Sequence, residues 1–160
     1  MAKGNEILIS NDPRGRIVDG TVEAAIKPGT CVQIDTSQTA LNANGRLAYT
    51  TYEPGQDGNK VLVAVLLEDM GKGKLATEAY VSGDQCRVYY PLPGDELNMV
   101  ISDISGTADD HSFGELLMID NGTGELVASS ASPEEEPFQL LETITDPTAD
   151  TLAHCIFTGV

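Results

Sequence analysis

Hydrophobic residues along this chain occur in short runs that are separated by Gly, Pro, Asn and Asp. Within several runs apolar and polar positions alternate: in "ELNMVIS", Leu97, Met99 and Ile101 would share one face of an extended strand. This pattern predicts many short β-strands, each with a buried face, and little helix. The predicted strands cover residues 6–10, 16–26, 30–35, 46–51, 61–68, 78–81, 86–90, 96–102, 115–120, 125–129, 138–144 and 151–157.

The segments between the predicted strands carry explicit turn chemistry. "KPGT" and "LPGD" place Pro before Gly, as a type II turn favours, and "NANGR" and "DNGTGE" carry the Asn-Gly signal of tight hairpins. In "YYPLPGDEL" we therefore expect Pro93 and Gly94 to occupy the centre of a turn. Asp95 and Glu96 are expected at its tip, where they would be dispensable for folding.

The run "VLVAVLLEDM" is the segment that hydrophobicity alone would also allow to be a helix. Its three valines and the Gly-rich "GKGK" that follows favour a buried strand. In "TVEAAI", Val22, Ala24 and Ile26 are expected to share one face. No exact internal repeat is present. Many short strands with turns between them indicate a mainly β fold, either a barrel or a sandwich.

Charge is distributed unevenly along the chain. The net charge is −16, yet residues 1–27 contain four basic and four acidic side chains and sum to zero. From Val88 to Val160 there are fourteen acidic residues and no Lys or Arg. Such a surface would repel a phosphate backbone, so the sequence predicts no nucleic-acid partner.

The cysteines and the apolar runs indicate an unexported protein without a membrane partner. Cys31, Cys86 and Cys155 are odd in number, scattered and each next to apolar residues, which suits reduced, buried thiols. No uninterrupted apolar run reaches the length of a membrane-spanning helix, and "MAKGNEILIS" lacks the pattern of a signal segment.

Catalytic and metal-binding patterns are missing from the sequence. His154 is next to Cys155, but neighbours on a strand point to opposite faces, so the two cannot form a catalytic dyad. Spacings typical of zinc ligands or of a phosphate-binding loop do not occur. The turn from Asp120 to Glu125 has oxygen ligands that a cation could use, although a plain hairpin turn is the simpler interpretation. We therefore expect no catalytic residues, no cofactor and no metal site.

Three segments in serial order resemble a known class of virion proteins. They are "GTVEAAIKPGTCVQID", "AYVSGDQCRVYYPLPGDELNMVI", and "ELLMIDNGTGELVAS" followed by "PFQLLETIT". Together they resemble the small phage head decoration proteins, also called cement or head-stabilising proteins, over roughly residues 16–160. Each motif alone is turn chemistry that many β proteins share, and the order of the motifs carries the resemblance.

The resemblance implies a compact β-barrel-like or β-tulip-like domain of short antiparallel strands. It also implies a structural role without catalysis or cofactor, binding to the major capsid protein on the outer surface of the capsid, and assembly as a homotrimer at three-fold or quasi-three-fold positions. Such a protein would be made in the host cytoplasm. A receptor- or glycan-binding β module is the alternative, and a trimeric all-β enzyme such as a nucleotide hydrolase is a third.

The interface candidates come from the least acidic part of the chain and from one aromatic pair. We divide the chain into an N-terminal arm, residues 1–15, and a single β domain, residues 16–160. The arm would be loose when free and would add a strand to a partner's sheet, whereas an ordinary first strand of the barrel is the alternative. The candidates for capsid or subunit contacts are Ile7, Leu8, Ile9, Arg14, Arg16, Tyr89 and Tyr90.

Overall fold

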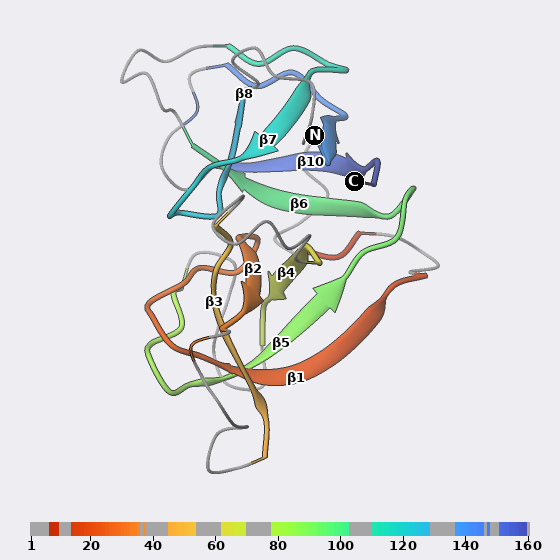
Figure 1. Ribbon diagram of the computed structural model, residues 1–160. Helices are drawn as coiled ribbons and strands as arrows, with labels where there is room; N and C mark the ends of the chain where they lie inside the picture. Colours follow the sequence, from red (N-terminus) through yellow and green to blue (C-terminus); the bar gives the residue numbers. More distant parts are fainter. Residues whose placement is uncertain are drawn as a thin grey trace.

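The computed structural model describes residues 7–9, 14–35, 37, 45–53, 62–69, 78–102, 110–128, 137–145, 147 and 151–159. Within these ranges the chain forms β-strands and no helix, and the strands close into two five-stranded barrels (Figure 1). The first barrel consists of β1 (Arg16–Val22), β2 (Cys31–Ile34), β3 (Leu47–Thr51), β4 (Ala64–Leu67) and β5 (Gln85–Tyr90). The second consists of β6 (Glu96–Ile101), β7 (Leu116–Ile119), β8 (Leu126–Ala128), β9 (Phe138–Leu140) and β10 (Thr151–Phe157). The predicted β-barrel class is confirmed.

The two barrels have the same topology. Around the first barrel the order is β1-β3-β2-β4-β5, and around the second it is β6-β8-β7-β9-β10, so the order repeats strand for strand. In each barrel the first and third strands are parallel and every other neighbouring pair is antiparallel. The register repeats as well, because the parallel pair Val22–Tyr49 corresponds to Ile101–Leu126. The chain is therefore a structural duplication.

The segment that precedes the second strand of each barrel is also duplicated. In each barrel an isolated β-bridge precedes a turn whose glycine has a positive φ, and the N–H of that glycine donates to the fourth strand at 2.8 Å. The matching residues are Ile26, Tyr80, Gly29 and Leu66 in the first barrel and His111, Ile144, Gly114 and Leu140 in the second.

Strand β4 contributes to two hydrophobic clusters because both of its faces are buried. Ala64 and Leu66 belong to the cluster inside the first barrel, whereas Val65 and Leu67 belong to a larger cluster that also contains the interior of the second barrel. A strand with two dry faces reads as a continuous apolar run. The prediction of a buried strand in "VLVAVLLEDM" is confirmed.

Backbone hydrogen bonds join the two barrels where β2 begins. The N–H of Cys31 donates to the carbonyl of Gly124 at 2.8 Å, and the N–H of Val100 donates to the carbonyl of Gly29 at 2.9 Å. Both contacts connect the turn before β2 with strands or turns of the second barrel. Because these bonds are short and buried, they fix the position of one barrel against the other.

The predicted burial of the β6 face and of the cysteines is confirmed, whereas that of Ala24 is not. Leu97 and Met99 face the core, and all three cysteines are free and buried. Ala24 is exposed, so the prediction that it shares the buried face of Val22 was wrong. The physical reason is that β1 ends at Val22, which breaks the alternation on which the prediction depended.

We predict that Gly124→Ala destabilises the protein more than Gly122→Ala in the same turn. Both glycines have positive φ, so each substitution carries backbone strain of about 1 kcal/mol or more. A Cβ on Gly124 would lie 2.3 Å from the carbonyl oxygen of Cys31, whereas none of the atoms around Gly122 lies within 4 Å. We expect a loss of about 3 kcal/mol for Gly124→Ala in urea unfolding, because the junction must shift as well. Equal losses for the two variants would contradict the role of this junction.

Candidate functional site

The turn between the two barrels is built around a buried carboxylate. Gly94 has a φ of 97°, which confirms its predicted place at the centre of the turn, and its N–H donates to the carbonyl of Phe157 at 2.8 Å. Asp95 is buried and Glu96 is the first residue of β6, so the prediction that these two residues form the tip of the turn was wrong. A buried carboxylate must be hydrogen-bonded, and the surrounding chain supplies the donors.

The donors to Asp95 come from three separate parts of the turn region. Its carboxylate accepts from the Tyr89 hydroxyl at 2.7 Å, from the N–H of Leu92 at 2.8 Å and from the N–H of Arg14 at 3.3 Å. Burial by itself would raise the pKa of Asp95. The hydrogen bonds from Tyr89, Leu92 and Arg14, together with the Arg14 charge, outweigh that effect and lower the pKa below its usual value.

Tyr89 extends the same network to the start of β1. Burial and the hydrogen bond to Asp95 raise the pKa of Tyr89 to about 12, so the hydroxyl stays protonated and donates. The same hydroxyl accepts from the N–H of Gly15 at 2.8 Å. A Cβ on Gly15 would lie 2.1 Å from the carbonyl oxygen of Tyr90, so glycine is required there. The network therefore fixes residues 14–16 against the end of β5.

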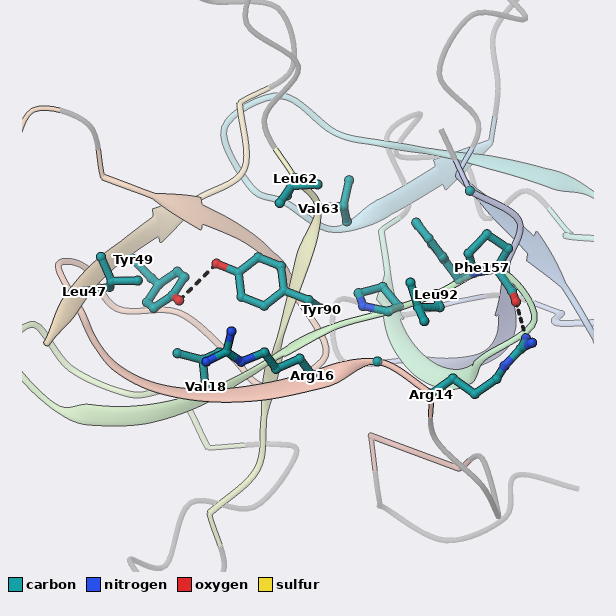
Figure 2. Close-up of a pocket in the computed structure, with 14 residues that line it drawn as sticks. Arg14, Arg16, Val18, Leu47, Tyr49, Leu62, Val63, Tyr90, Leu92 and Phe157 are labelled. Carbon is teal, nitrogen blue, oxygen red and sulfur yellow. Dashed lines mark hydrogen bonds between the residues drawn. The ribbon is translucent and has the colours of Figure 1, made fainter.

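Next to this network, a groove of about 700 Å³ opens at one end of the first barrel (Figure 2). Arg16 and Val18 of β1, Tyr49 of β3 and Tyr90 of β5 line it. Val18 shares a face of β1 with the buried Val22, Tyr90 shares a face of β5 with the buried Val88, and Tyr49 belongs to the buried cluster itself, so the groove is the open mouth of the barrel. The hydroxyls of Tyr49 and Tyr90 are 3.0 Å apart and form a polar point within the groove.

The groove extends from the mouth across the turn to the end of the second barrel. Pro91 to Pro93 and, from the C-terminal segment, Phe157 and Gly159 line this part. Leu62 is 75% exposed and Leu92 is 48% exposed, so large apolar side chains border the groove and face solvent. Apolar side chains that converge at an open site are typical of a surface that binds another molecule.

Two guanidinium groups give the groove a positive character. Arg14 donates to the carbonyl of Pro93, and this fixes its side chain at one end of the groove. Arg16 has no carboxylate within ion-pairing distance among the residues that the structure describes. The second barrel contributes no Lys or Arg, because residues 88–160 contain none. The groove is therefore a basic, apolar site on an acidic protein.

The structure brings three of the seven predicted interface residues together. Arg14, Arg16 and Tyr90 all line the groove. Tyr89 is fully buried, which corrects its assignment as a contact residue, because alternation along β5 directs it away from the face of Tyr90. Sequence reasoning missed Tyr49 and Leu62. Both fall within the predicted strands 46–51 and 61–68, and no feature of the sequence marked them as groove residues.

The remaining candidates, Ile7, Leu8 and Ile9, lie elsewhere. Ile7 is fully buried, and Leu8 forms an antiparallel bridge with Leu97 of β6. Residues 7–9 are thus a short strand segment of the chain's own second barrel, which corresponds to the alternative interpretation of an ordinary strand. Ile7 packs in the core and is not available for a partner. Residues 1–6 and 10–13 of the predicted arm lie outside the described residues.

Other side chains that could carry chemistry take part in interactions within the fold. The Nε2 of His154 lies 2.9 Å from a carboxylate oxygen of Glu96 across the β6–β10 pair. Cys155 points to the opposite, buried face of β10. Asp120 accepts from the Thr123 hydroxyl at 2.7 Å within the β7–β8 turn. Among the described residues, no group of three or more His, Cys, Asp or Glu is placed to hold a metal ion. The same part of the chain has no helix long and apolar enough to cross a membrane.

Comparison with solved structures finds a similar fold in a phage protein. The structure described as "The crystal structure of head fiber gp8.5 N base in bacteriophage phi29" has a TM-score of 0.53 to this chain at 11% sequence identity. The similarity covers 90% of this chain and 94% of that chain. At this identity the likeness concerns the fold. No family model matches the chain, and no curated protein matches it.

We predict that Asp95→Asn lowers the free energy of unfolding at neutral pH by about 2 kcal/mol, because hydrogen bonds to a charged acceptor contribute about 1.5 to 3 kcal/mol. The pKa of Asp95 is lower in the folded state. The advantage of the wild type is therefore complete above the unfolded-state pKa and shrinks as the pH falls through the folded-state pKa.

Urea unfolding of both proteins at a series of pH values measures this difference. Asp19→Asn, which replaces an exposed carboxylate, is the matched control and is expected to change stability little. A difference between wild type and Asp95→Asn that stays constant down to the lowest pH would contradict the role of the charged carboxylate.

Proposed function

We propose that this chain is a structural virion protein that binds the outer surface of a phage capsid through the basic groove, without catalysis or cofactor. The observation that carries the proposal is the groove itself. It combines exposed Leu62 and Leu92 with the guanidinium groups of Arg14 and Arg16 on a protein whose net charge is −16. The likeness of fold to a phage head fiber base over nearly the whole of both chains supports a place on a phage head.

Charge explains why docking would use this part of the molecule. The first 87 residues carry nine basic and eleven acidic side chains and sum to −2, whereas residues 88–160 sum to −14. Like charges that face one another across an interface cost several kcal/mol, so the acidic second barrel is poorly suited to close contact with a protein of mixed charge. The first barrel would face the capsid, and the second barrel would face solvent.

The proposal includes stabilisation of the capsid by a homotrimer at three-fold or quasi-three-fold positions. The resemblance of the turn-and-strand order to phage decoration proteins supports this arrangement. A decoration role would require that each protein contact more than one capsid subunit, directly or through its trimer.

A receptor-binding module is the second candidate, and one observation favours it. Phe113 is 68% exposed on a turn of the second barrel. The N–H of Glu115 donates to the carbonyl of Ser112 at 3.1 Å, and the Glu115 carboxylate accepts from the N–H of Ser112, so the turn is held rigidly. An aromatic side chain on a rigid turn is a common contact residue in binding surfaces.

Cosedimentation with purified capsids of the phage that encodes the chain tests the main proposal. We expect saturable binding that weakens as salt is raised above about 0.15 M, because exposed charges farther apart than about 8 Å are then screened. Phe113→Ser is the control variant, since it lies on the second barrel and should leave capsid binding unchanged.

The capsid experiment also separates the two candidates. Loss of capsid binding in Phe113→Ser would favour the second barrel as the contact and argue against the groove. No sedimentation of the wild type with capsids at any salt concentration would contradict the proposal.

A further inference from the structure

The duplicated barrels differ at one strand edge. In the second barrel the edge of β6 that lies beyond β8 is filled by residues 7–9. The N–H of Asn98 donates to the carbonyl of Ile7 at 2.7 Å, and the N–H of Ile9 donates to the carbonyl of Glu96 at 3.0 Å. Leu8 is directly opposite Leu97 in this antiparallel pair and packs against the core of the second barrel.

The register of the duplication identifies the matching edge in the first barrel. The pair Val22–Tyr49 corresponds to Ile101–Leu126, so positions 17, 18 and 19 of β1 correspond to positions 96, 97 and 98 of β6. Strand β3 pairs with β1 only from Gly20 onward. Within the described part of the chain, residues 17–19 therefore have a strand partner on the β5 side alone.

The backbone groups at this edge point in the direction that an added strand needs. The N–H of Val22 donates toward the β5 side, to Asp84, whereas the N–H of Glu23 donates to Tyr49 of β3. Because backbone groups alternate along a strand, the carbonyl of Ile17 and the N–H of Asp19 point to the β3 side. These are the counterparts of the Glu96 carbonyl and the Asn98 N–H, which bind residues 7–9 in the second barrel. Ile17 is 42% exposed, as expected for an uncovered edge.

We propose that an extended segment of a partner protein pairs antiparallel with residues 17–19 of β1 and completes the first barrel as residues 7–9 complete the second. This inference rests on the proposed function, because it places the segment in the capsid protein. Addition of a strand to an exposed edge is an established mode of peptide recognition, in which backbone bonds give affinity and alternate side chains give specificity.

The residues around the edge specify the side chains of the segment. The residue opposite Val18 would point into the groove, as Leu8 points to the second core opposite Leu97, so it must be apolar. In an antiparallel pair, the residue two positions later lies opposite Arg16 on the same face. Arg16 has no carboxylate partner among the described residues, so this residue must be Asp or Glu. The recognised pattern is an apolar residue, any residue, then an acidic residue.

Position 16 distinguishes the two barrels chemically. Its counterpart in the second barrel is Asp95, whose carboxylate is buried and receives its hydrogen bonds from within the chain. Arg16 is exposed at the groove and is free to pair with a carboxylate from outside. The lining residues also spread from Leu47 and Tyr49 at the barrel mouth to Phe157 at the other end, an elongated arrangement that fits an extended chain better than a compact ligand (Figure 2).

A short peptide provides the first test. The probe is acetyl-Thr-Ile-Thr-Glu-Thr-amide, and its control has an N-methyl group on the Thr that follows Ile. That N–H is the counterpart of the Ile9 N–H, so methylation removes one edge hydrogen bond and leaves every side chain in place. We expect millimolar probe to shift the amide NMR signals of Ile17 and Asp19, and we expect the methylated control to bind about tenfold more weakly.

Two variants extend the test to the peptide and to capsids. Arg16→Glu reverses the charge opposite the acidic residue, and Arg87→Glu makes the same change at an exposed position of the neighbouring strand, outside the groove. Asp19→Pro removes the outward N–H and spares the ladder to β5, because proline is tolerated where the N–H of an edge residue faces solvent. We expect Arg16→Glu and Asp19→Pro to weaken binding about tenfold or more and Arg87→Glu to bind as the wild type.

The outcomes separate this inference from the proposed function. If the wild type binds capsids and both Arg16→Glu and Asp19→Pro bind them equally well, the edge is not the contact, although the proposed function stands. If the wild type binds no capsid, the proposed function fails, and the peptide shifts still decide whether the edge accepts a strand. Equal binding of the probe and its methylated control would overturn the inference. Self-association that Asp19→Pro abolishes would assign the edge to a second copy of the chain and would also overturn it.

Discussion

The carboxylate of Asp95 is the interaction on which the arrangement of the molecule depends. It lies at the single turn where the first barrel passes into the second, and it is removed from solvent. A charge in that position is tolerated only while its hydrogen bonds are made, so Tyr89, Leu92 and Arg14 must all remain in place. Through Tyr89 the same carboxylate also fixes Gly15 and the start of β1.

This constraint also shapes the groove. Arg14 and Arg16 lie on either side of Gly15, so the hydrogen-bond network that holds Gly15 also positions the backbone from which both arginine side chains extend. The turn that Asp95 organises supplies Pro91 to Pro93 to the groove wall. A loss of the network would therefore alter the shape of the groove as well as stability. The same few hydrogen bonds stabilise the turn and position the groove wall.

The two barrels have the same topology but differ in charge and in how one strand edge is completed. The second barrel uses residues 7–9 and the turn before β2 to complete its edge, and it carries the excess of negative charge. The first barrel is nearly neutral and leaves the matching edge of β1 without a described partner. One barrel is thus completed internally, and the other keeps a basic, apolar opening. Because of this asymmetry, the first barrel is better suited to contact with a protein partner, and the acidic second barrel is better suited to face solvent.

The sequence by itself determined the local structure, because alternation and turn chemistry depend on near neighbours. The strands in "ELNMVIS" and "CRVYY", the positive φ of Gly94, the burial of the cysteines and the exclusion of a Cys155–His154 dyad follow from residues that are close in the chain. The contrast between the acidic second half and the near-neutral first half also follows directly from the sequence. Arg14, Arg16 and Tyr90 were identified as contact candidates from charge and aromatic character alone.

Only the tertiary structure decided how these strands pair, because pairing joins residues that are far apart in sequence. The duplication is not evident in the sequence because many corresponding positions hold different residues, such as Tyr49 and Leu126, and only the register relates them. Ile7 reads as part of a free arm until its pairing with β6 places it in the core. Asp95 reads as a turn-tip residue until Tyr89 and Arg14 approach it from β5 and from the start of β1. The groove and the open edge of β1 exist because closure of a barrel is a property of the whole set of strands.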